Sequence, residues 1–349
     1  MQPTIRQGIV TVTKLIRLPG YFNKKMVGLF TGHRLLRMNQ SLRLVFMGTP
    51  DFAVASLQRL LDVGCPVVAV VTAPDRPSGR GLTLTPSPVK KAAEAAGLPV
   101  LQPEKLRDPQ FLEQLASYQA DLHVVVAFRM LPEVVWAMPR IGTFNLHGSL
   151  LPQYRGAAPI NWAIINGETE TGVTTFFIEK EIDTGQMIFQ DREPIHADDT
   201  AGTLHDRLME RGADLVLKTV RAIEAGDYPR TSQPPADDLK PAPKLSRETT
   251  EINWNQPARV VRNFVRGLSP YPTAWTLINT ERGPDKFYKI YAVSVANESP
   301  MPAEPGTAWT DHKRQILVRV ADGWLSVDAL QAEGKRRMMA DAFLRGNAL

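Results

Sequence analysis

The chain has 349 residues, 43% hydrophobic and 22% charged, which is the balance of a globular protein with room for two domains. No apolar run approaches the roughly 20 residues that a membrane-spanning helix needs, so we expect no membrane contact. The single cysteine, Cys65, excludes disulfides within one chain. These features fit the cytoplasm, and we expect a monomer, although none of them determines the oligomeric state.

The net charge of +5 is unevenly distributed along the chain. Residues 1–37 carry seven Lys or Arg and no acid, residues 38–244 carry 20 basic and 25 acidic groups, and residues 245–349 carry 14 and 11. A basic, acid-free N-terminus is typical of a transit peptide, but this one has no serine, and Met38 stands just before the first strand pattern. We expect residues 1–40 to be a mis-started or unstructured extension rather than a working targeting signal.

Strand and helix patterns alternate through the next part of the chain. Strands are predicted over residues 42–47, 67–72, 122–128, 143–147 and 173–179, with 187–195 as an antiparallel neighbour of the last. Helices are predicted over residues 51–63, 90–96, 111–118, 159–165 and 200–225. This alternation favours an α/β domain over residues 41–228, built on a Rossmann-like, doubly wound and mostly parallel sheet.

The composition and the periodicity of the sequence change after residue 228. Five prolines in residues 229–244 indicate an extended linker without periodicity. A helix over residues 257–268 then precedes short strand patterns at 289–295, 316–320 and 324–327. Several short strands separated by turns predict a small C-terminal β-barrel, OB-like, over residues 245–349.

The most specific motif reads Asn-Leu-His-Gly-Ser-Leu-Leu-Pro over residues 145–152. Asn145 and His147 are two residues apart on a strand, so their side chains project from the same face. An amide can donate to a developing oxyanion, and an imidazole can take a proton near neutral pH. An Asp-Thr-Gly at residues 183–185 offers a carboxylate that could orient the imidazole, although the same three residues are also common in turns. The set indicates direct acyl transfer to an amine.

This run resembles the active-site strand of the folate-dependent formyltransferases. The resemblance implies a catalytic trio of Asn145, His147 and Asp183, a folate pocket lined by Ser149, Leu150, Leu151 and Pro152, and 10-formyltetrahydrofolate as the formyl donor. Backbone groups near residues 124–131 would hold the pterin ring. The histidines outside this motif have no ligand spacing and no cysteine partner, so no metal is expected.

Two groups of arginines suggest a nucleic-acid partner. The loop over residues 73–88 places Arg76 and Arg80 among glycines, and long loops in compact domains are usually functional. Arg259, Arg262 and Arg266 fall on one face of a helix in the positively charged C-terminal part. The loop resembles the insertion that meets the acceptor end of tRNA in the methionyl-tRNA branch of the same family. That branch formylates initiator methionyl-tRNA for translation initiation.

The sequence leaves other functions open. Gly48-Thr49-Pro50 follows the first strand but lacks the three-glycine spacing of a dinucleotide site, so a nicotinamide oxidoreductase is disfavoured. A folate-dependent formyltransferase acting on a small amine would share the first domain. A non-catalytic RNA-binding protein would keep the arginines without needing the trio. The five arginines could also be ordinary solvated surface residues.

Overall fold

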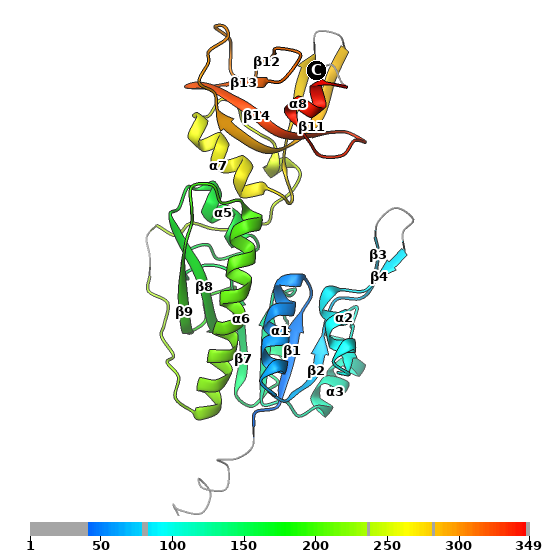
Figure 1. The fold of residues 1–349 in the computed structure, drawn as a ribbon. Helices are drawn as coiled ribbons and strands as arrows, with labels where there is room; N and C mark the ends of the chain where they lie inside the picture. The colour runs from blue at the N-terminus through cyan, green and yellow to red at the C-terminus, as the bar shows by residue number, and fades with distance from the viewer. Residues whose placement is uncertain (1–40, 79–82, 236–237, 281–282, 347–349) are drawn as a thin grey trace, which may run out of the picture. The chain divides into compact units, whose positions relative to one another are not determined.

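The computed structural model describes residues 41–78, 83–235, 238–280 and 283–346 (Figure 1). The predicted N-terminal extension and Arg80 lie outside the described residues. No helix in these described ranges is long and apolar enough to cross a membrane.

The first part of the chain is built on a seven-stranded sheet with the strand order β5-β2-β1-β6-β7-β8-β9. The first five strands in this order are parallel, and β8 and β9 run antiparallel to their neighbours. The prediction of a mostly parallel sheet is therefore confirmed. The strands are β1 (Leu44–Gly48), β2 (Val67–Val71), β5 (Val100–Leu101), β6 (Leu122–Val126), β7 (Gly142–His147), β8 (Glu170–Phe177) and β9 (Met187–Pro194).

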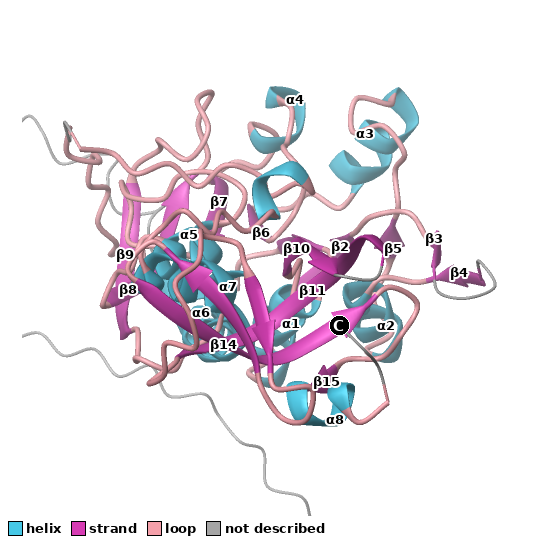
Figure 2. Cartoon of the chain, turned by 90° about the horizontal axis from the view of Figure 1, so that it is seen from above, coloured by secondary structure: helices cyan, strands magenta, loops and turns pink. Residues whose placement is uncertain are grey.

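Helices cover both faces of this sheet, which explains why β1 and β6 are buried along their whole length. One core joins the sheet to α1 (Asp51–Asp62), α2 (Pro88–Ala95), α5 (Pro159–Ile165) and α6 (Ala201–Ala225). A second core, on the other face, holds α3 (Pro109–Ser117) and α4 (Glu133–Trp136) (Figure 2). The long α6 starts at a Thr200 capping box and ends at Gly226, whose left-handed φ of 71° suits glycine.

A second sheet and a third core form the C-terminal part. Its antiparallel strands follow the order β10-β11-β14-β13-β12, with β15 paired to β14, and curl into a half-barrel (Figure 1). The helix α7 (Ala258–Leu268) packs Val261, Val265 and Leu268 into this core. The other elements are η1 (Glu248–Thr250), β10 (Ala274–Thr280), β11 (Gly283–Val295), β12 (Ala308–Thr310), β13 (Ile316–Val320), β14 (Gly323–Ala332), β15 (Met338–Met339) and α8 (Ala340–Leu344).

Two segments without predicted structure are more ordered than the sequence suggested. The loop over residues 73–88 contains a small hairpin of β3 (Arg76–Ser78) and β4 (Thr83–Thr85), which proline and the lack of alternation hide from a pattern search. The Pro-rich linker is extended, but Thr231 forms a bridge to Met187 and Ala242 forms one to Gly156. The linker therefore lies against the first sheet and the turn that follows β7.

Candidate active site

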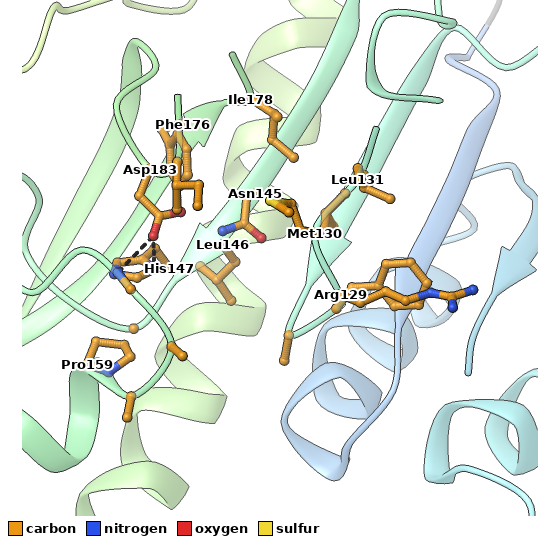
Figure 3. Close-up of a pocket in the computed structure, with 18 of the residues that line it drawn as sticks. Arg129, Met130, Leu131, Asn145, Leu146, His147, Pro159, Phe176, Ile178 and Asp183 are labelled. Carbon is orange, nitrogen blue, oxygen red and sulfur yellow. Dashed lines mark hydrogen bonds and ion pairs between the residues drawn. The ribbon is translucent and has the colours of Figure 1, made fainter. Parts of the chain in front are cut away.

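The strand β7 carries the two side chains that the sequence singled out. It lies between β6 and β8, with Asn145 opposite Val125 on one side and Phe176 on the other. Strand alternation places Asn145 and His147 on the same face, and both line one cavity with Asp183 (Figure 3). The structure thus brings the amide, the imidazole and the carboxylate to one cavity, and their catalytic roles stay a prediction.

The cavity has a volume of ≈ 840 Å³, which is in the range of pockets that enclose a drug-sized or cofactor-sized ligand. One wall is the segment 127–131, which leaves the end of β6 through Ala127 at a left-handed φ of 47°. The opposite wall is the loop 178–183, and the floor includes Asn145 and the start of α5. The cavity opens at the carboxyl ends of the parallel strands, where ligands bind in open α/β sheets.

His147 is buried and held from two sides. Its Nε2 lies 2.8 Å from the backbone oxygen of Tyr154, and because a carbonyl can only accept, Nε2 must carry the proton. Its Nδ1 lies 3.9 Å from an oxygen of Asp183 (Figure 3). The ring of Phe176 packs edge-on against the imidazole, with 6.4 Å between the two ring centroids. In the neutral imidazole, Nδ1 is therefore the nitrogen with a free lone pair, and it can take a proton beside the carboxylate.

Tyr154, whose carbonyl sets this tautomer, is held by hydrogen bonds of its own backbone and side chain. Its backbone adopts a left-handed φ of 60°, and its N–H donates to the Lys240 oxygen of the linker at 2.7 Å. Its phenol donates to Glu168 at 2.6 Å. Burial, together with the Glu168 carboxylate, raises the pKa of the Tyr154 phenol well above its usual range, so the phenol remains a donor. No residue pattern predicts this contact, because a backbone carbonyl has no residue signature.

Asp183 lies in a tight loop whose composition has a physical reason. Its φ of 55° is left-handed, a region that Asp tolerates better than most side chains. Its Oδ2 accepts a hydrogen bond from the Gly156 N–H at 2.9 Å. Two residues on, a Cβ at Gly185 would overlap the Phe177 backbone oxygen, so only glycine fits there. The Asp-Thr-Gly sequence is therefore both a turn and the carrier of a carboxylate.

The four residues assigned to the folate pocket, Ser149 to Pro152, form a turn directly after β7. The Ser149 hydroxyl donates to the Gln153 oxygen at 2.6 Å, and the Ser149 oxygen accepts from the Thr174 hydroxyl at 2.6 Å. None of the four belongs to the wall of the ≈ 840 Å³ cavity. Their contacts connect the end of β7 to β8, and their role in folate binding stays a prediction.

The arginines predicted to meet nucleic acid occupy different surroundings. Arg76 is exposed on β3 and, with Arg129, borders a second cavity of ≈ 350 Å³ at the start of α2. Arg259 is exposed at the first turn of α7.

Arg262 and Arg266, further along α7, make contacts with the loop that precedes α6. Arg262 donates to the Ala197 oxygen at 3.1 Å and to Asp198 at 3.0 Å. Arg266 donates to the backbone oxygens of His196 and Asp199, at 3.3 Å and 2.9 Å. These two guanidinium groups thus join α7 to the loop 196–199, whatever else they bind.

We expect Arg266→Ala to lower the free energy of unfolding by about 2 kcal/mol, because it leaves the partly buried Asp199 carbonyl without its charged donor. Arg259→Ala, at an exposed position of the same helix, should change it by less than about 0.5 kcal/mol. Urea denaturation of both variants measures the difference. Equal stabilities would show that the contacts of Arg266 contribute nothing to folding.

Within the described part of the chain, no cluster of three or more His, Cys, Asp or Glu could hold a metal ion. An amide donor, a histidine with an available Nδ1 and a carboxylate within 4 Å of it suit acyl transfer with proton movement.

Comparison with known proteins gives consistent matches along both parts of the chain. Residues 42–220 match the formyl transferase family, and residues 244–348 match the formyl transferase C-terminal domain. A methionyl-tRNA formyltransferase of Parabacteroides distasonis is 55% identical over 313 residues, covering 88% of this chain and 96% of that protein. One from Bacteroides fragilis is 52% identical over 310 residues, covering 88% and 95%. The solved structure of a sugar 3N-formyl transferase has 20% identity and a TM-score of 0.60, covering 85% of this chain and 100% of that one.

Proposed function

This chain belongs to the formyl transferase family, and on that premise we propose that it formylates the methionine amine of initiator methionyl-tRNA, using 10-formyltetrahydrofolate. The convergence of Asn145, His147 and Asp183 on one cavity is the observation that carries the proposal. The 55% identical relative, which bears the name methionyl-tRNA formyltransferase, supports the choice of acceptor.

The chemistry follows from the three side chains. The amine nitrogen attacks the formyl carbon, a C–N bond forms, and the bond from that carbon to the folate nitrogen breaks. The Asn145 amide donates to the oxygen that becomes negative. Nδ1 of His147 accepts the proton that the amine loses, and the Asp183 carboxylate stabilises the resulting imidazolium. His147 then returns this proton to the departing folate nitrogen, so protons balance over the cycle.

The cavity fits the folate in size and in lining. Its volume of ≈ 840 Å³ can enclose a ring system and part of a tail. Phe128, Met130, Leu131 and Ile178 supply apolar surface, and the segment 127–131 presents backbone groups at the strand end. We propose that the ring lies against this segment, with its formyl group toward Asn145. We propose that Ser149 to Pro152 also belong to the folate pocket, where their turn would support the residues of the cavity wall.

A formyl-transfer assay tests the proposal. The enzyme should formylate charged initiator methionyl-tRNA in preference to charged elongator methionyl-tRNA and to free methionine. Efficient formylation of a small amine without tRNA would favour the small-amine alternative. If the protein binds tRNA but neither transfers a formyl group nor binds tetrahydrofolate, it is a non-catalytic RNA-binding protein.

We propose that Arg76 and Arg80 contact the acceptor end of the tRNA and that Arg259, Arg262 and Arg266 contact its backbone. Arg76 and Arg259 are exposed, as such contacts require. The cytoplasmic location and the monomeric state expected from the sequence belong to the same proposal.

Replacing Arg76 and Arg259 together by Ala should weaken tRNA binding and make it less dependent on salt. Each lost phosphate contact reduces counterion release, so the slope of log K against log salt should become shallower by about 1.4 to 1.8. Arg140→Ala, at the opposite end of the parallel strands from the cavity, is the control and should keep the wild-type slope. Titrations at several salt concentrations measure this, and unchanged slopes would mean that both arginines are merely solvated.

A further inference from the structure

The linker brings a polar side chain to the loop that carries Asp183. Thr231 and Met187 exchange both backbone hydrogen bonds, at 2.8 Å and 3.0 Å, so this part of the linker pairs with the first residue of β9. Gln233 follows two residues later and is partly buried. This pairing fixes the position of Gln233 beside residues 183–185.

Each end of the Gln233 amide makes two hydrogen bonds. Its Nε2 donates to the backbone oxygens of Asp183 and Gly185, at 2.8 Å and 3.0 Å. Its Oε1 accepts from Nε and Nη2 of Arg155, at 3.1 Å and 2.6 Å. Since carbonyls only accept and a guanidinium only donates, one orientation of the amide satisfies all four contacts.

These contacts link Asp183 to the segment 155–156 by two routes. Arg155 is followed by Gly156, whose N–H donates to the Asp183 carboxylate at 2.9 Å. The same short segment therefore holds the Asp183 side chain directly and the Asp183 backbone through Gln233. The second half of the linker holds the segment in turn, because Ala242 accepts from Ala157 at 2.7 Å and donates to the Arg155 oxygen at 2.8 Å.

We propose that Gln233 is a positioning residue for the reaction, acting through Asp183. This inference rests on the proposed function, because it assigns Gln233 to the same formyl transfer. Asp183 adopts a left-handed φ of 55°, so its loop needs external contacts to hold one conformation. Gln233 supplies them to the carbonyls on either side of Thr184, and this fixes the carboxylate relative to Nδ1 of His147. The linker is thereby part of the active site as well as a connection.

The test combines Gln233→Glu with Asp183→Asn in the full-length chain. A glutamate at position 233 keeps the length and the acceptor for Arg155 but cannot donate to the two loop carbonyls. We expect Gln233→Glu to lower kcat about 10-fold with little change in the KM for the folate, since a displaced carboxylate costs rate rather than ground-state binding. In the Asp183→Asn background the same change should cost less than about 2-fold, because residues that act through one group are not additive.

Gln153→Glu is the matched control. Gln153 also connects to the linker, donating to the Asp238 oxygen at 3.1 Å and accepting from the Lys240 N–H at 2.9 Å, but it makes no contact with Asp183 among the described residues. Its effect on kcat, of whatever size, should be the same in both backgrounds. Gln233→Met, which removes both polar ends, replaces Gln233→Glu if that variant does not fold.

The outcomes separate this inference from the function on which it rests. An equal loss from Gln233→Glu in both backgrounds, or no loss in either, would overturn the positioning role while leaving the function intact. If the unmodified chain transfers formyl to no acceptor, the proposed function itself is overturned. Tetrahydrofolate binding of each variant, measured by calorimetry, confirms that the pocket is still formed.

Discussion

Asn145→Ala is expected to lower kcat about 100-fold or more while leaving the affinity for tetrahydrofolate nearly unchanged. The amide acts mainly when charge develops on the formyl oxygen, so its loss raises the barrier without weakening ground-state binding. Its position supports this role, because Asn145 lies on the cavity floor between β6 and β8 and is anchored by ladders on both sides. Steady-state kinetics with charged tRNA, together with direct folate binding, measure both quantities.

Asn145→Asp separates the donor function from the shape of the side chain. It keeps the size of the amide but places a carboxylate beside the developing oxyanion, so its kcat should fall at least as far as that of Asn145→Ala. Asn255→Ala, at an exposed position before α7, is the control and should keep wild-type turnover. Near-normal turnover in both Asn145 variants would contradict the assignment of β7 as the active-site strand.

Local rules explain why the sequence could predict the common orientation of Asn145 and His147, while the catalytic role of both residues stays a prediction. Strand alternation alone places Asn145 and His147 on one face of β7. The boundaries of α5 and β13 were also predicted to the residue, since helical and strand periods are clear there. Asp183 was identified through its Asp-Thr-Gly motif, although the motif alone could not show that its loop reaches His147.

The surroundings of the trio could not be predicted, because they depend on contacts between distant segments. The Tyr154 carbonyl and the Gln233 amide act through geometry that no residue pattern records. Similarly, the spacing of Arg262 and Arg266 placed them on one helical face but could not show that this face meets the loop 196–199. Residue spacing defines a helical face, but it does not show which partner contacts that face.

Gly185→Ala is expected to lower kcat about 100-fold, because catalytic groups displaced by roughly 1 Å lose about that much rate. The added methyl group would overlap the Phe177 backbone oxygen, which cannot rotate away as a side chain could. Phe177 also donates its N–H to the Gln186 oxygen at 2.9 Å, so the two segments are tied together just beyond Gly185. The loop must therefore move, and it carries Asp183 with it.

Gly323→Ala is the matched control, because a Cβ at that position would meet nothing within 4 Å. It should keep wild-type kcat and change the free energy of unfolding by less than about 0.5 kcal/mol. For Gly185→Ala, tetrahydrofolate binding distinguishes a displaced loop from an unfolded protein, since the wall at residues 127–131 lies on a different segment. Wild-type kcat in a folded Gly185→Ala protein would show that the position of Asp183 does not govern the rate. The proposed stabilisation of the imidazolium by that carboxylate would then have to be abandoned.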